Sequence, residues 1–418
     1  MLAVTVLHAA WPAAYLGLLQ IIGLVPTDVP FLDASYVLGS AECARRGVDI
    51  YSTNPCDPMG RVYDYSPLLI DLMPPGVTAG WTMAVGLILA LAFYASLALL
   101  PPVRGRWPMA AMVLASLSTM CAYALERANI DALILIMMIG AGALAGGREA
   151  RRLGGHALVL SAGLLKFYPL AGLVLLAREP PRRGLAIAAC CLLVLLLLCL
   201  AYGATLFQSI GNRPIGFSFT DAFAAANLPQ GAAILLGPLG RDHPALAPVL
   251  AWMPAVLGLV FALRALLQAM RYAMRMPAAV WEAPEAPYLA MGAALIVGCF
   301  FTGFSIYYRG VDFLLVLPGL LALGRTDRTA SGVVIAILFL MWSEAFRQGI
   351  VQGLPLLGLN PVAVNNVHAL FWLIRELVWW RVVAVLLGIV LAFVASTFWG
   401  RWALQYVPHD DNKGSQPI

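Results

Sequence analysis

Residues 31–75 read FLDASYVLGSAECARRGVDIYSTNPCDPMGRVYDYSPLLIDLMPP, a polar stretch between long apolar segments. The whole chain is 61% hydrophobic and 11% charged, whereas this stretch carries acidic and basic side chains from Asp33 to Asp71 and two cysteines. Chemistry in water can take place in a polar segment of this kind. We therefore expect the apolar segments to hold it at a membrane surface and to supply charged groups that meet it there.

The apolar segments predict an all-α polytopic membrane protein. The chain has 418 residues and a mean hydropathy of +0.85, and apolar runs of about 18 or more residues recur from end to end. We predict a single integral membrane domain over residues 1–404 and a polar tail over 405–418, disordered and cytoplasmic. The net charge of +5 does not indicate nucleic-acid binding, because most arginines lie beside apolar runs, where they orient a membrane protein.

The predicted spans follow the apolar runs. They lie at about 2–25, 77–100, 107–126, 129–146, 184–203, 245–270, 287–304, 310–323, 330–346 and 377–400. We interpret the first as a retained span, not as a removed signal peptide.

Residues 156–177 predict a short helical hairpin rather than one crossing. Both flanks are basic, with Arg148, Arg151 and Arg152 before the segment and Arg178, Arg182 and Arg183 after it. The positive-inside rule places both flanks in the cytoplasm, and Pro169 in LKFYP disfavours helix at the centre. The hairpin gives about 12 membrane segments, with both termini in the cytoplasm.

This topology defines the extracytoplasmic face of the predicted membrane protein. That face carries residues 26–75, 126–129, Lys166, 204–244, 305–309 and 347–376. Within the first loop, residues 34–46 predict a helix that lies in the membrane interface, with Glu42, Arg45 and Arg46 on its water-facing side.

The cysteines divide into two groups. Cys43 and Cys56 lie in the first loop, in an oxidising compartment under this topology. A disulfide between them would hold the loop in place; the alternative is two free thiols. No His lies nearby and CxxC spacing is absent, so we predict no metal site there. Cysteines in apolar runs predict packing roles; they are Cys121, Cys190, Cys191, Cys199 and Cys299.

Four groups of charged residues lie at the outer ends of the apolar runs, where an unpaired charge is costly. The first contains Asp33 and Tyr36; the alternative role of Asp33 is to cap the N-terminus of a helix. The second is ERANID (residues 126–131), in which Arg127 and Asp131 are spaced to pair on one helix face.

The third group is Lys166 in LKFYP, which must extend toward water or meet an anion. The fourth is SIYYRGVD (residues 305–312), in which Arg309 and Asp312 are spaced for a local pair. The alternative role for its tyrosines is that of interface aromatics.

Together these groups predict chemistry on a lipid-linked phosphate. They place three cations, Arg127, Lys166 and Arg309, on one face with a carboxylate-rich loop. Cations hold and stabilise a departing phosphate, and a carboxylate takes the proton of an attacking hydroxyl. An anion site at the mouth of a hydrophobic groove suits a lipid-linked phosphate.

The order of these motifs resembles glycosyltransferase family 87 and its bacterial relatives. The matching motifs are Asp33 with Tyr36, GVDIY (47–51), YDYSP (63–67), ERANID, LKFYP and YYRGVDFLLVLP (307–318), and the resemblance runs from about residue 28 to residue 323. Members of this family are polytopic enzymes of the GT-C class that use polyprenyl-phosphate sugars, and the known members are mannosyltransferases.

The resemblance implies a GT-C-like helical bundle, with Asp33 as the catalytic base and Arg127, Lys166 and Arg309 around the donor phosphate. We expect supporting roles for Tyr36, Tyr65, Glu126, Asn129, Asp131, Tyr168 and Tyr308. It implies a lipid-linked donor of mannose or another hexose or pentose, a lipid or glycan acceptor, and no cofactor. Inverting, metal-independent transfer is the expected reaction.

Two further functions stay open at this point. One is a transporter or flippase of lipid-linked saccharides, and the other is a non-catalytic protein of envelope assembly. For the transferase, loops 204–244 and 347–376 would shape the acceptor site. Their candidate residues are Arg213, Asp221, Asn227 and Arg347.

Overall fold

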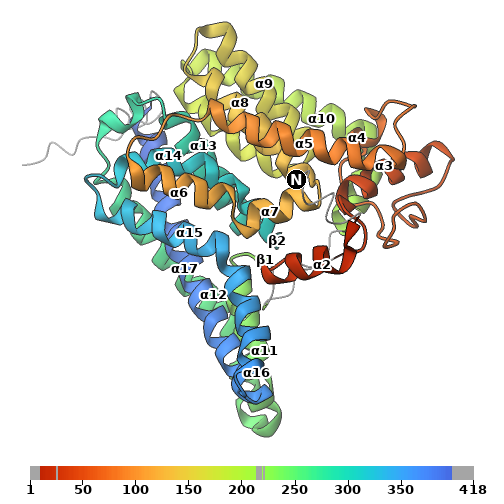
Figure 1. The fold of residues 1–418 in the computed structure, drawn as a ribbon. Helices are drawn as coiled ribbons and strands as arrows, with labels where there is room; N and C mark the ends of the chain where they lie inside the picture. The colour runs from red at the N-terminus through yellow and green to blue at the C-terminus, as the bar shows by residue number, and fades with distance from the viewer. Residues whose placement is uncertain (1–9, 25–26, 213–218, 220–221, 398–418) are drawn as a thin grey trace, which may run out of the picture.

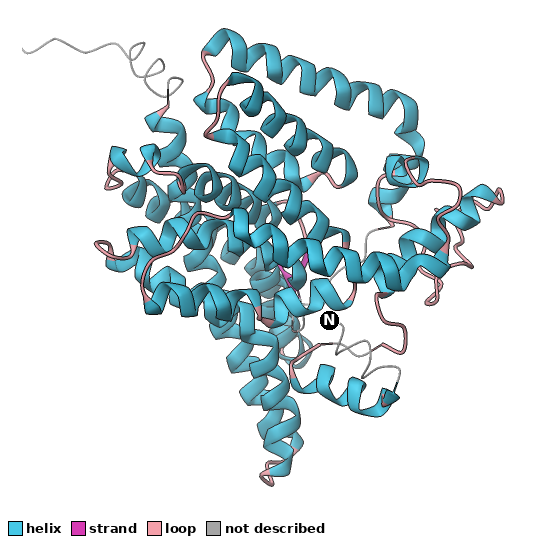
Figure 2. Cartoon of the chain, turned by 45° about the horizontal axis from the view of Figure 1, so that its top comes forward, coloured by secondary structure: helices cyan, strands magenta, loops and turns pink. Residues whose placement is uncertain are grey.

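The computed structural model describes residues 10–24, 27–212, 219 and 222–397, which are almost entirely helical (Figure 1, Figure 2). Within these ranges the strands are β1 (Ala222–Phe223) and β2 (Ser305–Ile306), which form one antiparallel pair. The predicted all-α class is therefore confirmed for the described residues. The predicted tail 405–418 lies outside them.

The first half of the chain is a series of helices with short connections. They are α2 (Pro12–Ile21), α3 (Leu32–Arg45), α4 (Pro67–Asp71), η1 (Ala79–Trp81), α5 (Thr82–Ser96), η2 (Leu97–Leu99), α6 (Arg106–Ser116), α7 (Thr119–Glu126), α8 (Ile130–Ala145), α9 (Glu149–Leu165), η3 (Tyr168–Arg178) and α10 (Pro181–Gly211).

The second half continues in the same way. Its helices are α11 (Asn227–Asp242), η4 (Pro244–Leu246), α12 (Ala247–Ala273), η5 (Ala278–Glu282), α13 (Ala286–Phe301), η6 (Tyr307–Asp312), α14 (Phe313–Leu323), α15 (Arg328–Gln348), η7 (Gly349–Gly353), α16 (Leu354–Leu356) and α17 (Pro361–Ser396).

Several of these helices are long and apolar enough to cross a membrane, which indicates a membrane protein. In the described ranges there are six: Ala79–Leu99, Arg106–Glu126, Pro181–Gly211, Ala247–Ala273, Arg328–Leu356 and Pro361–Ser396. Other predicted spans form shorter helices. The run 129–146 becomes α8 with 16 residues, 287–304 becomes α13 with 16, and 310–323 contains α14 with 11. The run 2–25 contains α2 with 10 residues, and residues 1–9 lie outside the described ranges.

Residues 149–183 fold back on themselves, as the basic flanks predict. Helix α9 ends at Leu165 and η3 begins at Tyr168 and packs against it. The Arg152 Nε on α9 donates to Oε1 of Glu179, just beyond η3, at 3.0 Å. The two basic flanks therefore lie at the same end of the hairpin.

The prediction of loops at 204–244 and 347–376 is wrong over much of their length. Helix α10 continues to Gly211, α11 covers Asn227–Asp242, and α17 begins at Pro361. The start of α17 carries a local signal: Asn360 Oδ1 accepts from the Ala363 N–H at 2.9 Å, and Pro361 occupies the first helical position. In Figure 1, α11, α12, α16 and α17 extend together below the rest of the molecule.

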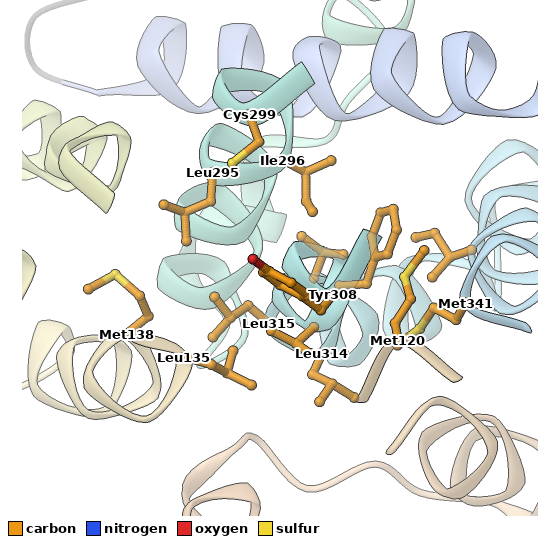
Figure 3. Packing of buried hydrophobic residues seen from close by; sticks show 14 of the residues in the cluster. Met120, Leu135, Met138, Leu295, Ile296, Cys299, Tyr308, Leu314, Leu315 and Met341 are labelled. Atoms are coloured by element: carbon orange, nitrogen blue, oxygen red, sulfur yellow. The ribbon is translucent and has the colours of Figure 1, made fainter. Parts of the chain in front are cut away.

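The core is built around α13, which is buried over most of its length and packs against η3, α14 and α17. A helix that is apolar on every side belongs in the interior. Figure 3 shows Leu295 and Ile296 of this helix beside Tyr308, Leu314 and Leu315. Other helices expose apolar side chains instead, because they face lipid. On α10 these include Leu192, Leu193, Leu196, Leu197 and Leu200.

Candidate functional site

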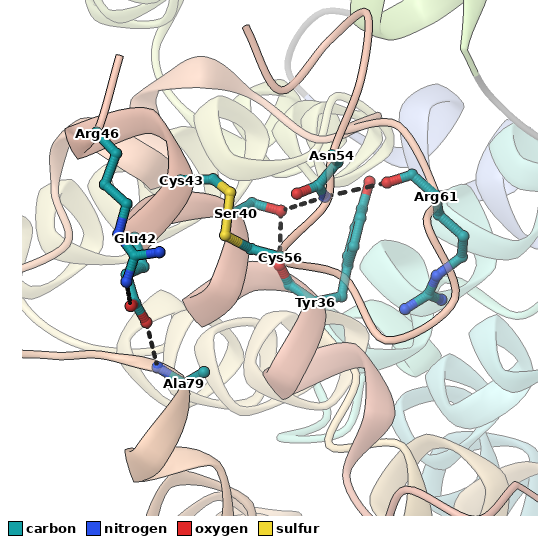
Figure 4. Close-up of a disulfide and its surroundings, with 9 residues drawn as sticks. All are labelled: Tyr36, Ser40, Glu42, Cys43, Arg46, Asn54, Cys56, Arg61 and Ala79. Atoms are coloured by element: carbon teal, nitrogen blue, oxygen red, sulfur yellow. Dashed lines mark hydrogen bonds and ion pairs between the residues drawn. A yellow bond between two sulfur atoms is a disulfide. The ribbon is translucent and has the colours of Figure 1, made fainter. Parts of the chain in front are cut away.

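The polar first loop is closed by a disulfide between Cys43 on α3 and Cys56 (Figure 4). The Cα atoms of the two cysteines are 6.0 Å apart. Gly39, one turn earlier on α3, lets the loop approach, because a Cβ there would lie 2.5 Å from the Cys56 carbonyl oxygen. The free-thiol alternative does not hold in the structure.

Helix α3 is more buried than the predicted interfacial helix. Residues from Leu32 to Ala41 are buried, and only its C-terminal end, with Arg45 and Arg46, is exposed. The predicted helix therefore forms, and its charged end at Arg45 and Arg46 is exposed as predicted, but the rest is buried in the protein instead of lying in the membrane interface. The helix is a wall of the site, not a surface element.

Asp33 lies inside the first turn of α3 and does not cap the helix. Phe31 is the residue before the helix, in a left-handed conformation with φ of 56°. Its N–H donates to the Glu126 carbonyl oxygen at 2.9 Å, and the Asp33 N–H donates to that of Arg127 at 2.9 Å. The C-terminus of α7 thus accepts the free N–H groups of α3.

The Asp33 carboxylate is buried and fully engaged. Its Oδ1 accepts from Arg61 Nη1 at 3.0 Å, and its Oδ2 accepts from Asn129 Nδ2 at 2.6 Å. Arg127 Nη1 lies 3.8 Å from Oδ1. Arg61 was not among the residues that the sequence predicted for the site, and it also binds Asp57 at 2.9 Å.

The ERANID motif is a break between two helices. Helix α7 ends at Glu126, Ala128 has a φ of 46°, and α8 begins at Ile130. Arg127 and Asp131 therefore do not share a helix face, and the expected local pair between them is absent. Asn129 caps α8 by accepting from the Asp131 N–H at 2.9 Å.

Glu126 lies on the other side of this break. Its Oε1 accepts from the Tyr15 hydroxyl at 2.8 Å, and its Oε2 lies 3.9 Å from Arg127 Nε. The break thus turns consecutive charged residues toward different partners, with Glu126 toward α2 and Arg127 toward α3.

Asp131 is the centre of a second charged group. Lys166 Nζ donates to both Asp131 carboxylate oxygens at 2.9 Å, and Arg309 Nε lies 3.6 Å from Oδ2. Lys166 therefore meets an anion instead of extending toward water. Asp312 is fully buried, and neither of its carboxylate oxygens has a hydrogen-bond partner among the described residues, so the alternative of a local Arg309–Asp312 pair does not hold.

Aromatic rings enclose these cations. Lys166 Nζ lies 4.8 Å from the ring centre of Tyr65 and 5.8 Å from that of Tyr308. The Arg309 guanidinium carbon lies 5.3 Å from the ring centre of Tyr168. A cation is stabilised over the face of an aromatic ring. Three of the predicted supporting tyrosines therefore hold the two cations in place.

A cavity of about 220 Å³ lies beside the second group. Lys166, Tyr168, Tyr308 and Arg309 line it, and so does Asp64. Asp33 and Arg127 do not line it. The predicted donor-site residues therefore divide between the two charged groups, and only Lys166 and Arg309 reach the cavity.

Some polar groups of this cavity lack partners. The Ser66 Oγ, the Tyr168 hydroxyl and Arg309 Nε are buried and have no hydrogen-bond partner among the described residues. Buried polar groups are nearly always satisfied in folded proteins. Three unsatisfied groups around one cavity therefore indicate a polar ligand.

Asp64 is the carboxylate that lines the cavity, and it was not among the residues that the sequence predicted for the site. Its Oδ1 accepts from the Tyr36 hydroxyl at 2.9 Å, and its backbone N–H donates to the same hydroxyl at 2.9 Å. Burial raises the pKa of Asp64 above that of an ordinary aspartate, against the hydrogen bond from Tyr36 and the charge of Lys166. The signal that could have found it is its place in YDYSP, one of the quoted motifs.

Two of the four residues predicted for an acceptor site belong to the described part of the chain. Arg213 and Asp221 fall outside the described residues. Asn227 is buried near β1, and Arg347 Nε donates to Glu344 at 2.6 Å. Neither of these two lines the cavity, and their part in an acceptor site stays a prediction.

Two further findings concern metal ions and the similarity of the chain to known proteins. No group of three or more His, Cys, Asp and Glu side chains that could hold a metal ion occurs in the described ranges. Comparisons of the chain with protein-family models, with curated proteins and with solved structures found no match.

Proposed function

We propose that this protein is a membrane glycosyltransferase that transfers a sugar from a polyprenyl-phosphate donor to a lipid or glycan hydroxyl. The observation that carries the proposal is the cavity that Lys166, Arg309 and Asp64 line together. Two cations suit a departing phosphate, and an acid with a raised pKa suits the deprotonation of a hydroxyl. The resemblance of the motifs to glycosyltransferase family 87 supports the same reaction.

The phosphate would bind between Lys166 and Arg309. Both cations are directed by Asp131, which lies 2.9 Å from Lys166 Nζ and 3.6 Å from Arg309 Nε. Lys166 offers donors beyond those that Asp131 accepts, and Arg309 offers a planar fork suited to phosphate oxygens. The free Tyr168 hydroxyl adds a donor beside Arg309. Asp131 is therefore a positioning residue in this proposal.

Asp64 would act as the general base. The acceptor O–H proton moves to Asp64 as the acceptor oxygen forms a bond to the anomeric carbon. The bond from that carbon to the phosphate oxygen breaks, and the polyprenyl phosphate leaves with the electron pair. This attack from the opposite side inverts the anomeric centre.

Asp33 has a different part in this proposal from the one that the motif resemblance implies. Both of its oxygens accept hydrogen bonds from buried donors, Arg61 and Asn129. A general base must reach the proton that it takes, whereas Asp33 does not line the cavity. We assign Asp33 to the positioning of Arg61 and Arg127 beneath the site.

The membrane arrangement is part of the proposal. About 12 membrane segments, two of them in the hairpin, would leave the cavity on the extracytoplasmic side of a bacterial inner membrane. The donor lipid would then enter from the outer leaflet. The long apolar helices and the basic flanks of the hairpin support this arrangement.

Asp64→Asn tests the proposal in membranes supplied with radiolabelled polyprenyl-phosphate sugars and a lipid or glycan acceptor. Transfer should fall by about 10²- to 10⁴-fold, because the general base is lost. Asp49→Asn is the matched control, an exposed acid of the same loop that hydrogen-bonds to Ser52, and it should keep wild-type transfer.

Asp33→Asn separates the two acids. If folded Asp33→Asn loses all transfer while Asp64→Asn retains it, then Asp33 is the base and the assignment to Asp64 fails. If no sugar is transferred by the wild type but labelled lipid crosses the membrane, the protein is a transporter, and the glycosyltransferase proposal fails.

A further inference from the structure

A second polar site lies in a groove between α12 and α17, far along the chain from the residues of the cavity. The groove has a volume of about 390 Å³, and its lining includes Arg264 and Gln268 of α12 and Trp380 and Arg381 of α17. It shares no lining residue with the cavity of Lys166 and Arg309. Both helices are among the segments long enough to cross a membrane.

The two arginines have no carboxylate partner within the described ranges. Arg264 and Arg381 form no ion pair there, in contrast to Arg375, which pairs with Glu344 and Glu376 one to two turns before Arg381. Neither Ala247–Ala273 nor the part of α17 after Glu376 contains an acidic residue. Two guanidinium groups thus line one groove without compensating charge.

The surroundings of the groove are apolar and exposed. Leu263, Leu266 and Leu267 flank Arg264 on α12, and Leu377 precedes Arg381 on α17; all four side chains are exposed. Such a surface faces lipid in a membrane-spanning helix. An unpaired cation among lipid-facing side chains is costly, and such residues normally meet an anion.

Trp380 also lines the groove. The Trp380 indole is 4% exposed, and its Nε1–H has no hydrogen-bond acceptor among the described residues. The ring of Phe261 lies against it, with 5.5 Å between the ring centroids, and leaves this donor unsatisfied. A buried indole N–H usually finds a partner.

We propose that this groove binds the phosphate group of an anionic phospholipid. The phosphodiester supplies acceptor oxygens for Arg264 and Arg381, with Gln268 as a further donor. Its acyl chains lie along the exposed leucines of α12. Basic pockets between membrane helices bind lipid head groups in this way. A carboxylate-bearing peptide fits less well, because exposed leucines flank the groove and suit acyl chains better than a polar backbone.

The bound lipid would join α12 to α17. One guanidinium comes from each helix, so a single phosphate bridges them. These two helices already pack against each other along their length. The lipid therefore acts as a structural ligand in a groove where the described residues supply no acidic partner for the two arginines. The proposal does not depend on the sugar-transfer reaction.

The test is lipid binding by the full-length protein in nanodiscs of phosphatidylcholine with added phosphatidylglycerol. Native mass spectrometry counts the phosphatidylglycerol molecules that stay bound after release from the disc. Arg264→Gln with Arg381→Gln should weaken retention of phosphatidylglycerol by about tenfold or more, since charged hydrogen bonds are lost. Phosphatidylcholine retention should not change.

The control removes the same charge from the same region. Arg271→Gln with Arg275→Gln changes two basic residues at and beyond the end of α12, outside the groove, and should retain phosphatidylglycerol like the wild type. Arg264→Lys with Arg381→Lys keeps the charge and should retain part of the binding, which guards against a folding defect. Equal retention in the glutamine pair and the control pair would overturn the proposal, as would equal retention of the two lipids by the wild type.

Discussion

The two buried aspartates of the first loop differ in what surrounds their carboxylates. Asp33 accepts from Arg61 and Asn129, so a cationic donor and an amide donor engage both of its carboxylate oxygens. Asp64 accepts a hydrogen bond from the Tyr36 hydroxyl and lines the cavity. One loop therefore holds an engaged acid that orients arginines and a less engaged acid that is open to a substrate.

The pH dependence of transfer follows from the raised pKa of Asp64. The base works only when deprotonated, so the rate should fall as the pH falls through its pKa. Because that pKa is raised, the fall should begin at a higher pH than the value of about 3.9 for an ordinary aspartate implies. A profile of kcat against pH in detergent checks this.

The same profile for the variants identifies the group. Asp64→Asn should remove this acid limb from its residual activity, whereas Asp49→Asn should preserve it. An acid limb that is unchanged in Asp64→Asn would assign the titration to another residue.

At the scale of elements, the first loop and α3 form one unit. The disulfide from Cys43 to Cys56 closes the loop, Gly39 permits the close approach, and the start of α3 is hydrogen-bonded to the end of α7. Asn54 Nδ2 donates to Ser40 Oγ at 2.9 Å within the same loop (Figure 4). The loop is thus held against the helical break at Ala128, which brings Asp33 to Arg127.

Removal of the disulfide should loosen this unit. Cys43→Ser with Cys56→Ser should lower the stability of the folded protein by about 3 kcal/mol, because the cross-link limits a loop of roughly 15 residues in the unfolded chain. Thermal unfolding in detergent, followed by the fluorescence of a thiol-independent dye, measures the change.

Free cysteines supply the control. Cys190→Ser with Cys199→Ser removes two exposed thiols of α10 and should leave the unfolding temperature unchanged. If the two double variants unfold at the same temperature, the disulfide does not hold the loop.

At the scale of the whole molecule, two sets of charged residues lie at opposite ends of the helices, in addition to the ion pairs of Arg375 and the groove with Arg264 and Arg381. The first contains the residues around Asp33 and Asp131. The second joins the basic connections at the other ends of the helices: Arg325 Nη2 donates to the Arg104 carbonyl oxygen at 3.0 Å, and Arg178 Nη2 to that of Trp281 at 3.0 Å. This separation agrees with a membrane that divides an acid-rich face from an arginine-rich face.

Labelling of single cysteines tests the orientation of these faces. A cysteine placed beside Arg182 or Arg325 should stay unreactive toward a membrane-impermeant maleimide in intact cells and react after lysis. A cysteine placed beside Asp49 should react in both. Reaction from outside at the first two positions would reverse the proposed topology and place the cavity in the cytoplasm.

The sequence by itself determined what local composition controls. Apolar runs require helices, because an unpaired backbone is too costly in lipid, and the basic flanks of residues 156–177 indicated the hairpin. It also pointed to Arg127, Lys166 and Arg309, since charges at the ends of apolar runs need partners. The sequence could not determine which acidic side chain pairs with which basic side chain.

Tertiary structure decided those partners. The positive φ of Ala128 turns Arg127 and Asp131 away from each other, and only the packed helices bring Lys166 and Arg309 to Asp131 and leave Asp64 at the cavity. Spacing along the chain reports partners only within one helix, whereas these pairs join residues from distant helices. The physical reason is that a buried charge takes the nearest counter-charge in space, and the fold sets that distance.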